Sequence, residues 1–396
     1  MKQIVLVHYH EINLKGKNRG RFEACLQHNI ASALNGLPHE SIYRFGGRLI
    51  VELGENPPLA EIARRLKTIF GIANFAFAWT VPAEIKSIQE GLAQLVNGSG
   101  EFDSFKIDAR RGTKTFPLNS QQLNTLLGSF VQQLTHAAVR LENPQVVFFV
   151  EIVGHRAFLY RIKSQGAGGL PSGTGGKVLS LISGGIDSPV ASFRLMRRGC
   201  RVTFIHFHSF PHTTIESQEK VKRILRILSC YQSDSTLFLV PFAEVQREIV
   251  ARAPAAMRVI LYRRFMLRIA EAVALREKAA ALVTGDSLGQ VASQTLENIR
   301  TISAAVNIPI FRPLIGDDKE DIIRIARAIG TYEISIQADQ DCCSLFVPKH
   351  PETMCSPEQA QSAEAGLDTS RLVQDALNAS LQESVKPDYS LIEGKL

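Results

Sequence analysis

The chain has 396 residues, of which 45% are hydrophobic, and it carries a net charge of +7 and six cysteines. This length exceeds one typical domain core, so we expect two or three domains. No apolar run is long enough to cross a membrane, which excludes a membrane-spanning protein. The cysteines are sparse and the N-terminus lacks the pattern of a signal peptide, which excludes a secreted protein held by disulfides. The sequence therefore predicts a cytoplasmic protein.

The positive charge is unevenly distributed. Residues 1–165 carry 19 Lys and Arg against 13 Asp and Glu, whereas the remaining residues carry 26 against 25. A basic first half is typical of a surface that binds a polyanion. Charge alone equally allows a solvated basic surface without a partner.

Residues 1–72 predict a small α+β domain. Its expected elements follow the order strand, helix, strand, strand, helix, at 3–9, 21–34, 41–45, 48–53 and 59–68. A basic loop at 11–19 joins the first two elements. This order is typical of a ferredoxin-like unit.

A second small domain is predicted over residues 73–165. Its expected helices and strands lie at 87–97, 104–110, 121–141, 146–152 and 157–162. Six of the fourteen residues at 164–177 are glycine, which indicates a junction, assigned to 166–177.

Residues 178–396 alternate between strand and helix patterns, with strands expected at 178–182, 202–207, 236–241 and 280–284. This alternation predicts an α/β domain, a doubly wound parallel sheet with helices on both faces. Ligands of such sheets bind at the carboxyl ends of the strands. Three segments fall at such ends: the glycine turn at 183–185, His206-Phe207 and Gly285-Asp286.

The most specific local pattern is Ser-Gly-Gly-Ile-Asp-Ser at 183–188, which follows a strand and precedes a helix opened by Pro189. The amides of Ser183, Gly184 and Gly185 at this turn are suited to a pyrophosphate, and Asp187 to a Mg²⁺ ion that bridges phosphates. The spacing differs from the Walker pattern. It resembles the PP-loop of ATP pyrophosphatases, which cleave ATP between the α and β phosphates. The alternative is an ordinary strand-to-helix turn.

Further residues of this half carry chemistry that suits a nucleotide site. In 284–295, which is expected to follow a strand and open a helix, Gly285 would let the chain pass over a nucleotide, and Gln294 would reach its ribose or base. Arg263, on a helix expected at 257–278, either faces solvent or offsets phosphate charge.

Three cysteines lie close together late in the chain, at 342, 343 and 355. A loop cysteine in an adenylating domain is a candidate nucleophile. The neighbouring Cys342 and Cys343 are poorly placed to bond to each other, so Cys355 is the more plausible resolving thiol.

The combination of 183–191, 285–295 and 341–344 resembles the ThiI family of tRNA 4-thiouridine synthetases. The segment 11–19 is similar to the start of that family, and 105–117 resembles its THUMP domain, an RNA-binding module. Residues 168–171 and 313–316 also fit. The resemblance therefore implies an α/β PP-loop ATP pyrophosphatase domain preceded by α+β ferredoxin-like and THUMP domains.

The resemblance implies a transferase that converts the uridine at position eight of tRNA into 4-thiouridine, using ATP and Mg²⁺ and releasing AMP and pyrophosphate. It assigns sulfur transfer to Cys343 and a role in activity to Lys319, beside Asp187, which the turn itself suggests for Mg²⁺. Cys342 is, besides Cys355, the other candidate for the resolving thiol. The expected ATP contacts are Leu181, Ile182, Ser183, Gly184, Gly185, Asp187, Ser188, His206, Phe207, Arg263, Gly285 and Gln294. The tRNA contacts that we expect are Lys15, Lys17, Arg19, Lys106, Arg110, Arg111 and Lys114.

The family also implies a cysteine desulfurase as persulfide donor and a homodimer. Some members end in a rhodanese domain. Here about forty residues follow Cys355, too few for that domain, so we expect the form without it. Sulfur supply for the thiamine thiazole is associated with the rhodanese part.

Two alternative functions stay open at this point. They are another PP-loop RNA-modifying or amidating synthetase, and a tRNA-binding module without thiolation activity.

Overall fold

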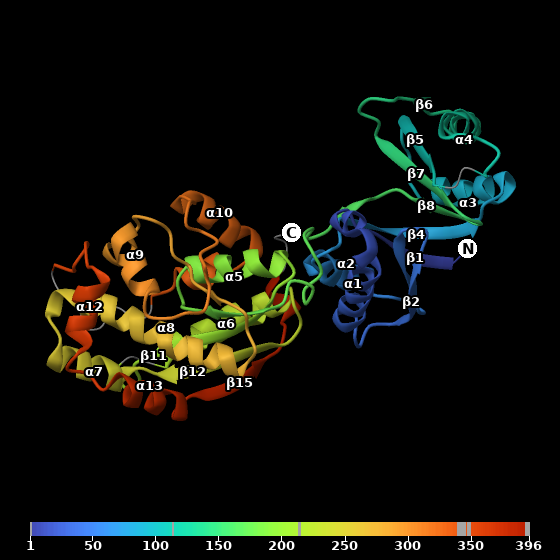
Figure 1. Ribbon diagram of the computed structural model, residues 1–396. Helices are drawn as coiled ribbons and strands as arrows, with labels where there is room; N and C mark the ends of the chain where they lie inside the picture. Colours follow the sequence, from blue (N-terminus) through green and yellow to red (C-terminus); the bar gives the residue numbers. More distant parts are fainter. Residues whose placement is uncertain (1, 113–114, 213–214, 339–345, 347–349, 393–396) are drawn as a thin grey trace. The chain divides into compact units, whose positions relative to one another are not determined.

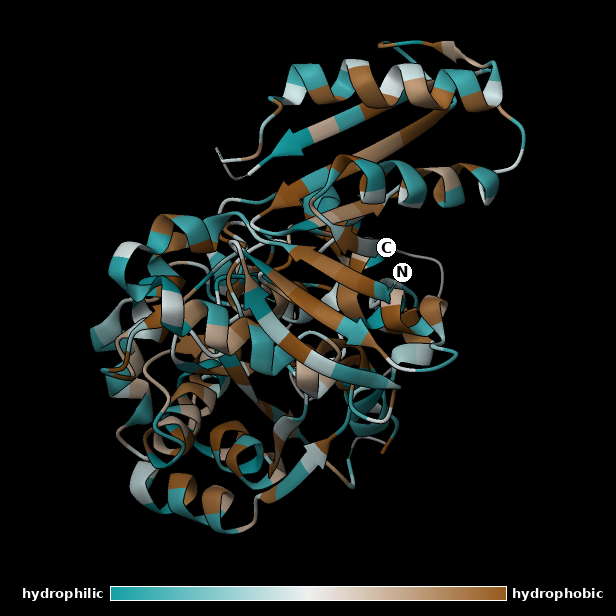
Figure 2. Ribbon diagram, turned by 90° about the vertical axis from the view of Figure 1, so that its right-hand side faces the viewer, coloured by the Kyte–Doolittle hydropathy of each residue, from teal (hydrophilic) through white to brown (hydrophobic). Residues whose placement is uncertain are grey.

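The computed structural model describes residues 2–112, 115–212, 215–338, 346 and 350–392. It contains two compact units, Met1–Gly169 and Leu170–Leu396 (Figure 1). In Figure 2 the helices alternate between hydrophobic and hydrophilic residues, as expected of helices that cover a sheet with one face. None of the helices in the described part of the chain is long and apolar enough to span a membrane.

The first unit is built on one nine-stranded sheet in the order β2-β3-β1-β4-β8-β7-β5-β6, with β9 paired to β4. The strands are β1 (Lys2–His8), β2 (His39–Phe45), β3 (Arg48–Leu53), β4 (Asn74–Pro82), β5 (Ser104–Arg111), β6 (Ala138–Val139), β7 (Val146–Val153), β8 (Arg156–Tyr160) and β9 (Ser164–Gln165). The helices are η1 (Glu11–Asn18), α1 (Arg19–Ala33), α2 (Leu59–Thr68), α3 (Ile85–Asn97) and α4 (Ser120–Thr135).

Strand β4 joins the two parts of this sheet, because it pairs antiparallel with β1 on one side and with β8 on the other. The sequence-based division between 1–72 and 73–165 falls just before this strand. Alternation along β1 supports the same connection. Val5 and Val7 pack in the core that contains residues of α1 and α2, whereas Ile4 and Leu6 pack with Phe158 of β8.

Two local predictions in this unit differ from the structure. The helix expected at 121–141 ends at Thr135, because His136 adopts a left-handed conformation (φ 59°) and Ala138–Val139 pairs with β5. The segment expected to be a basic loop is the short helix η1, which is interrupted at Gly16, where φ is 51°. A left-handed φ is where glycine is tolerated best.

A buried carboxylate ties four strands of this sheet together. Glu151 on β7 accepts hydrogen bonds from Tyr160 on β8 and from Arg48 on β3 (2.8 Å from Nε), and it lies 3.0 Å from His8 Nε2 on β1. Burial by itself would raise the pKa of Glu151, but the interactions with His8, Tyr160 and Arg48 outweigh it and hold the pKa well below its ordinary value of 4.5. The cluster therefore couples the two parts of the unit.

Replacing Glu151 with glutamine is expected to destabilise the first unit by about 3 kcal/mol at pH 7, since it leaves Arg48 without a buried counter-charge. Because the folded pKa is depressed, this stabilisation is present above pH 4.5 and is lost progressively as the pH falls below it. Urea unfolding followed by the fluorescence of Trp79, the single tryptophan of the chain, which lies on β4, reports this unit in the full-length protein.

The matched control is Glu61→Gln on α2, which removes a surface ion pair with Arg65 and is expected to cost less than about 1 kcal/mol. A loss in Glu151→Gln that stays constant from pH 7 to below pH 4 would contradict the assigned charge on Glu151.

The second unit contains a six-stranded sheet in the order β14-β13-β10-β11-β12-β15, in which all neighbours are parallel except β12 and β15. The strands are β10 (Lys177–Leu181), β11 (Arg201–His208), β12 (Ser235–Pro241), β13 (Leu282–Val283), β14 (Ile310–Phe311) and β15 (Leu381–Val385). The predicted α/β domain is confirmed. The antiparallel strand β15 is an element that the sequence analysis did not predict.

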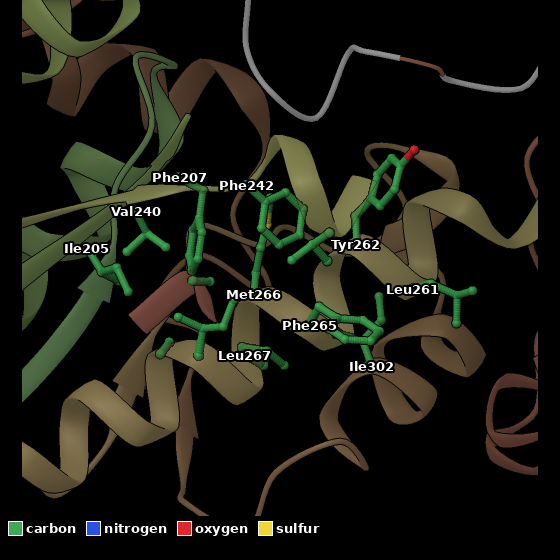
Figure 3. Packing of buried hydrophobic residues seen from close by; sticks show 14 of the residues in the cluster. Ile205, Phe207, Val240, Phe242, Leu261, Tyr262, Phe265, Met266, Leu267 and Ile302 are labelled. Carbon is green, nitrogen blue, oxygen red and sulfur yellow. The ribbon is translucent and has the colours of Figure 1, made fainter. Parts of the chain in front are cut away.

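Helices cover both faces of this sheet (Figure 1). They are α5 (Asp187–Arg197), α6 (Glu216–Ser229), α7 (Ala243–Arg252), α8 (Arg258–Arg276), α9 (Leu296–Ser303), α10 (Lys319–Ile329), α11 (Tyr332–Ser335), α12 (Pro357–Glu364) and α13 (Thr369–Asn378). Figure 3 shows part of the main core, where Phe207 of β11 and Val240 of β12 belong to one cluster with Phe265 and Met266 of α8. This packing brings α8 close to the carboxyl ends of the central strands.

Candidate active site

The PP-loop connects β10 to α5 and is held by its own side chains. The buried Ser188 accepts the Ser183 amide at 2.9 Å, and Ser183 Oγ accepts the Gly185 amide at 3.3 Å. Beneath the loop, Ser180 and Ser192 are hydrogen-bonded at 2.8 Å. The structure therefore differs from the expectation that all three amides are available to a pyrophosphate, since those of Ser183 and Gly185 are engaged within the loop. These bonds preform the turn.

A cavity of about 470 Å³ lies at the carboxyl ends of β10, β11 and β13. A volume of this size is typical of a small-molecule site. Eleven of the twelve residues predicted to contact ATP line it, and Gly184 is the exception. The eleven are Leu181, Ile182, Ser183, Gly185, Asp187, Ser188, His206, Phe207, Arg263, Gly285 and Gln294.

One wall of the cavity is apolar. Phe207, Met266, Leu267 and Ile302 line it, and Figure 3 shows them within one hydrophobic cluster. Such a wall suits the face of a nucleobase. The PP-loop supplies a polar wall at the positive end of α5, which suits phosphate groups.

A buried carboxylate that the sequence analysis left without a role organises the polar side. Asp286 follows β13, and its side chain is 4% exposed. It accepts hydrogen bonds from Arg263 (2.6 Å), Arg312 (3.1 Å) and Thr284 (2.7 Å). Burial would raise the pKa of Asp286, but the charge of Arg263, the hydrogen bond from Thr284 and the charge of Arg312 hold it well below the ordinary value. Asp286 therefore orients two guanidinium groups at the cavity.

Arg312 was also missed by the sequence analysis. It lines the cavity, and its Nη2 donates to Ser303 Oγ at 2.8 Å. The available signal was its position, directly after the strand at 310–311 and at the carboxyl edge of the sheet. Nothing in the sequence indicates that it shares Asp286 with Arg263, because the three residues come from three separate elements.

The two remaining charged residues predicted for catalysis contact each other. Lys319, the first residue of α10, lies 2.6 Å from Asp187 Oδ1, and Gln290 Nε2 lies 3.3 Å from Asp187 Oδ2. Asp318 caps α10 and places Lys319 at its first turn. The structure thus brings Asp187 and Lys319 together at the start of α5, across 132 residues of sequence.

Gly285 has a different steric role from the expected one. A Cβ at this position would lie 2.7 Å from the Ser188 amide nitrogen and 2.9 Å from the Asp187 carbonyl carbon. The residue therefore permits close contact between the loop after β13 and the backbone of the PP-loop itself. The segment expected to open a helix there is a loop that contains only the short 3-10 helix η3 (Ala292–Gln294), and α9 begins only at Leu296.

The comparisons with known proteins agree with this architecture. The family described as "Thiamine biosynthesis protein (ThiI)" matches residues 173–368, the ThiI ferredoxin-like domain matches 4–76 and the THUMP domain matches 82–161. A probable tRNA sulfurtransferase of Thermus thermophilus is 45% identical, over 95% of this chain and 93% of that relative. One of Moorella thermoacetica is 43% identical, over 98% and 99%.

The chain belongs to the ThiI family. A crystal structure of a 4-thiouridine synthetase–RNA complex with bound ATP has a TM-score of 0.89 and 36% identity to it, and covers 98% of this chain and 100% of that one. The predicted membership and the three-part fold of the ThiI family are therefore confirmed.

Two of the three cysteines that lie close together late in the sequence, Cys342 and Cys343, lie outside the described residues. The third, Cys355, is 1% exposed, and burial raises the pKa of its thiol. Its amide donates to Asn298 and its carbonyl accepts from Thr301, so it is fixed beneath α9. These contacts argue against the role of resolving thiol that was expected for Cys355.

The expected tRNA contacts fall into two groups in the first unit. Lys15 and Lys17 lie on η1 and Arg19 at the start of α1, whereas Lys106, Arg110 and Arg111 lie on β5. Lys114 lies outside the described residues. Arg19 and Arg111 are partly engaged inside the unit, by Glu23 and by the Phe116 carbonyl respectively.

Proposed function

We propose that this protein is an ATP-dependent tRNA sulfurtransferase that converts the uridine at position eight of tRNA into 4-thiouridine. The observation that carries the proposal is the preformed PP-loop cavity, lined by Asp187, Arg263 and Gln294, in a chain similar over nearly its full length to probable tRNA sulfurtransferases. The similarity to the 4-thiouridine synthetase crystallised with RNA and ATP supports both substrates.

The first step is adenylation of the target base. The first unit binds the tRNA phosphates through basic residues such as Lys15, Lys17 and Arg110, and the uridine enters the cavity. Its O4 attacks the α-phosphorus of ATP, the bond to the β-phosphate oxygen breaks, and pyrophosphate leaves. Arg263 and Arg312, both oriented by Asp286, offset the charge of the phosphates.

Mg²⁺ would be held by Asp187. Its carboxylate lines the cavity beside the PP-loop and is partly exposed, and Mg²⁺ is usually bound by one or two carboxylates together with substrate phosphates. The ion would neutralise phosphate charge. Lys319, which pairs with Asp187 in this structure, would contact the same phosphates after exchange of the ion pair.

The second step transfers sulfur from Cys343. A cysteine desulfurase first loads this thiol as a persulfide. The terminal sulfur attacks C4 of the adenylated uridine, the C4–O bond breaks and AMP leaves, so that the base is joined to Cys343 through two sulfurs. The thiol of a separate reductant attacks the Cys343 sulfur and forms a mixed disulfide with it, the S–S bond to the base breaks, and 4-thiouridine departs. A second thiol of the reductant then reopens the mixed disulfide. We place this reaction in the cytoplasm and in a homodimer.

The deciding experiment is nucleoside mass spectrometry of unmodified tRNA incubated with the protein, Mg-ATP, cysteine and a cysteine desulfurase. We expect 4-thiouridine to form, with one pyrophosphate released for each thiolated uridine, and neither product without ATP. Pyrophosphate release and tRNA binding without 4-thiouridine would overturn sulfur transfer and leave an adenylating enzyme of another kind.

Asp187→Asn is expected to slow tRNA-dependent pyrophosphate release by about 10²-fold, because the residue loses the charge that attracts a divalent cation. The variant is also expected to require a higher Mg²⁺ concentration for half-maximal rate. The measurement is initial pyrophosphate release across a Mg²⁺ titration. Gln290→Ala, which removes only a neutral partner of Asp187, serves as the control and should keep the wild-type Mg²⁺ dependence. Full activity of Asp187→Asn would rule out the metal role.

A further inference from the structure

The beginning of α6 holds the chain segment that leads toward Cys343. Lys220 is only 6% exposed, and its Nζ donates to the backbone carbonyl of Gln337 at 2.5 Å. One turn later on the same helix, Arg223 Nη1 donates to the side-chain oxygen of Gln337 at 2.8 Å. Two cationic side chains of α6 therefore converge on one residue, which lies six positions before Cys343 in the sequence.

The same segment is also attached to the PP-loop. Ser335, at the end of α11, donates through its hydroxyl to the Gly185 carbonyl at 3.3 Å. Within the stretch from Ser335 to Gln337, the chain thus contacts both the loop that receives phosphates and the helix α6. These three contacts give the stretch a defined place beside the nucleotide cavity.

The burial of Lys220 indicates that its hydrogen bond to Gln337 is a persistent contact of the folded protein. An ammonium group taken from water is costly unless hydrogen bonds compensate for its lost hydration. The acceptor at Gln337 is a backbone carbonyl, which is present whatever the side chain at that position. The contact therefore fixes the path of the backbone at Gln337 and does not depend on a particular partner side chain.

We propose that Lys220, supported by Arg223, is a positioning residue for sulfur transfer, which holds the segment before Cys343 beside the PP-loop. This inference rests on the proposed function. Six residues span at most about 20 Å, so the place of Gln337 limits where the Cys343 thiol can meet an adenylated base. Adenylation takes place in the cavity itself and does not need this anchor. Sulfur transfer does, because it requires reacting atoms to meet within a few ångström.

The test separates the two half-reactions in the full-length protein. Lys220→Met keeps the length of the side chain and removes the donor, and Arg223→Met removes the second contact from an exposed position. We expect Lys220→Met to form 4-thiouridine about tenfold or more slowly, while its pyrophosphate release in the first turnover, measured with enzyme in excess over tRNA, stays within about twofold of wild type. Arg223→Met should show the same split with a smaller loss of thiolation.

The matched control is Lys222→Met on the same helix, whose amine pairs with Glu219 and Glu383 instead. It should thiolate at the wild-type rate. The inference is overturned if both variants thiolate normally, or if pyrophosphate release falls in parallel with thiolation, as general destabilisation would produce. If Lys220→Met does not fold, Arg223→Met and Gln337→Ala test the inference by the same comparison of thiolation with pyrophosphate release. A wild-type protein that makes no 4-thiouridine would instead refute the proposed function.

Discussion

Replacing Cys343 with serine is expected to abolish 4-thiouridine formation, lowering its rate by at least about 10³-fold, while tRNA-dependent pyrophosphate release continues. A hydroxyl cannot carry a persulfide, but it leaves the PP-loop, Asp286 and its arginines unchanged. The measurement combines nucleoside mass spectrometry with a pyrophosphate assay on the same reactions. The variant should also fail to acquire sulfur from radiolabelled cysteine and the desulfurase.

Cys355→Ser provides the matched control. Because Cys355 is buried and hydrogen-bonded to its surroundings through its backbone, its replacement should leave a protein that still forms 4-thiouridine. If Cys343→Ser thiolates at the wild-type rate, the sulfur is carried by another thiol, and Cys342→Ser becomes the variant that should lose activity.

Gly285→Ala is expected to weaken ATP binding strongly. Its new methyl group would lie 2.7 Å from the Ser188 amide nitrogen, and backbone atoms at the start of α5 cannot move aside as a flexible side chain would. Overpacked contacts of this kind cost about 1–3 kcal/mol. Since that cost displaces the PP-loop from the cavity, we expect ATP to bind about tenfold or more weakly.

Isothermal titration calorimetry with a non-hydrolysable ATP analogue measures this effect directly. Gly316→Ala is the control, because a Cβ at that position of the same unit meets no atom within 4 Å. It should bind the analogue as tightly as wild type. Equal affinity of Gly285→Ala and wild type would show that the loop after β13 does not fix the PP-loop.

Much of the nucleotide site could be predicted from residues that lie close together in the sequence. The run at 178–191 predicts a strand, a tight turn and a helix, and each depends on residues within a few positions of one another: β-branched and apolar residues, two glycines, and Pro189 in the first helical turn. The carboxyl-edge rule for parallel sheets then places His206, Phe207 and Gly285 at the same edge. All three line the cavity.

The contacts between distant residues depended on the tertiary structure. The pairing of Asp187 with Lys319 and the sharing of Asp286 by Arg263 and Arg312 join elements far apart in the chain, and no local pattern encodes which charge meets which. For the same reason β15 was missed. A short, exposed strand of mixed polarity has little hydrophobic periodicity, and it becomes a strand because β12 offers a free edge to pair with.

Short-range sequence patterns were thus enough to predict the family, the order of the domains and the phosphate-binding turn. The joining of the first two domains through β4 and Glu151, the burial of Cys355 and the anchoring of Gln337 by Lys220 were decided only by the tertiary structure. Each of these depends on which surfaces meet when the hydrophobic cores form, and packing of that kind is set by the whole chain at once.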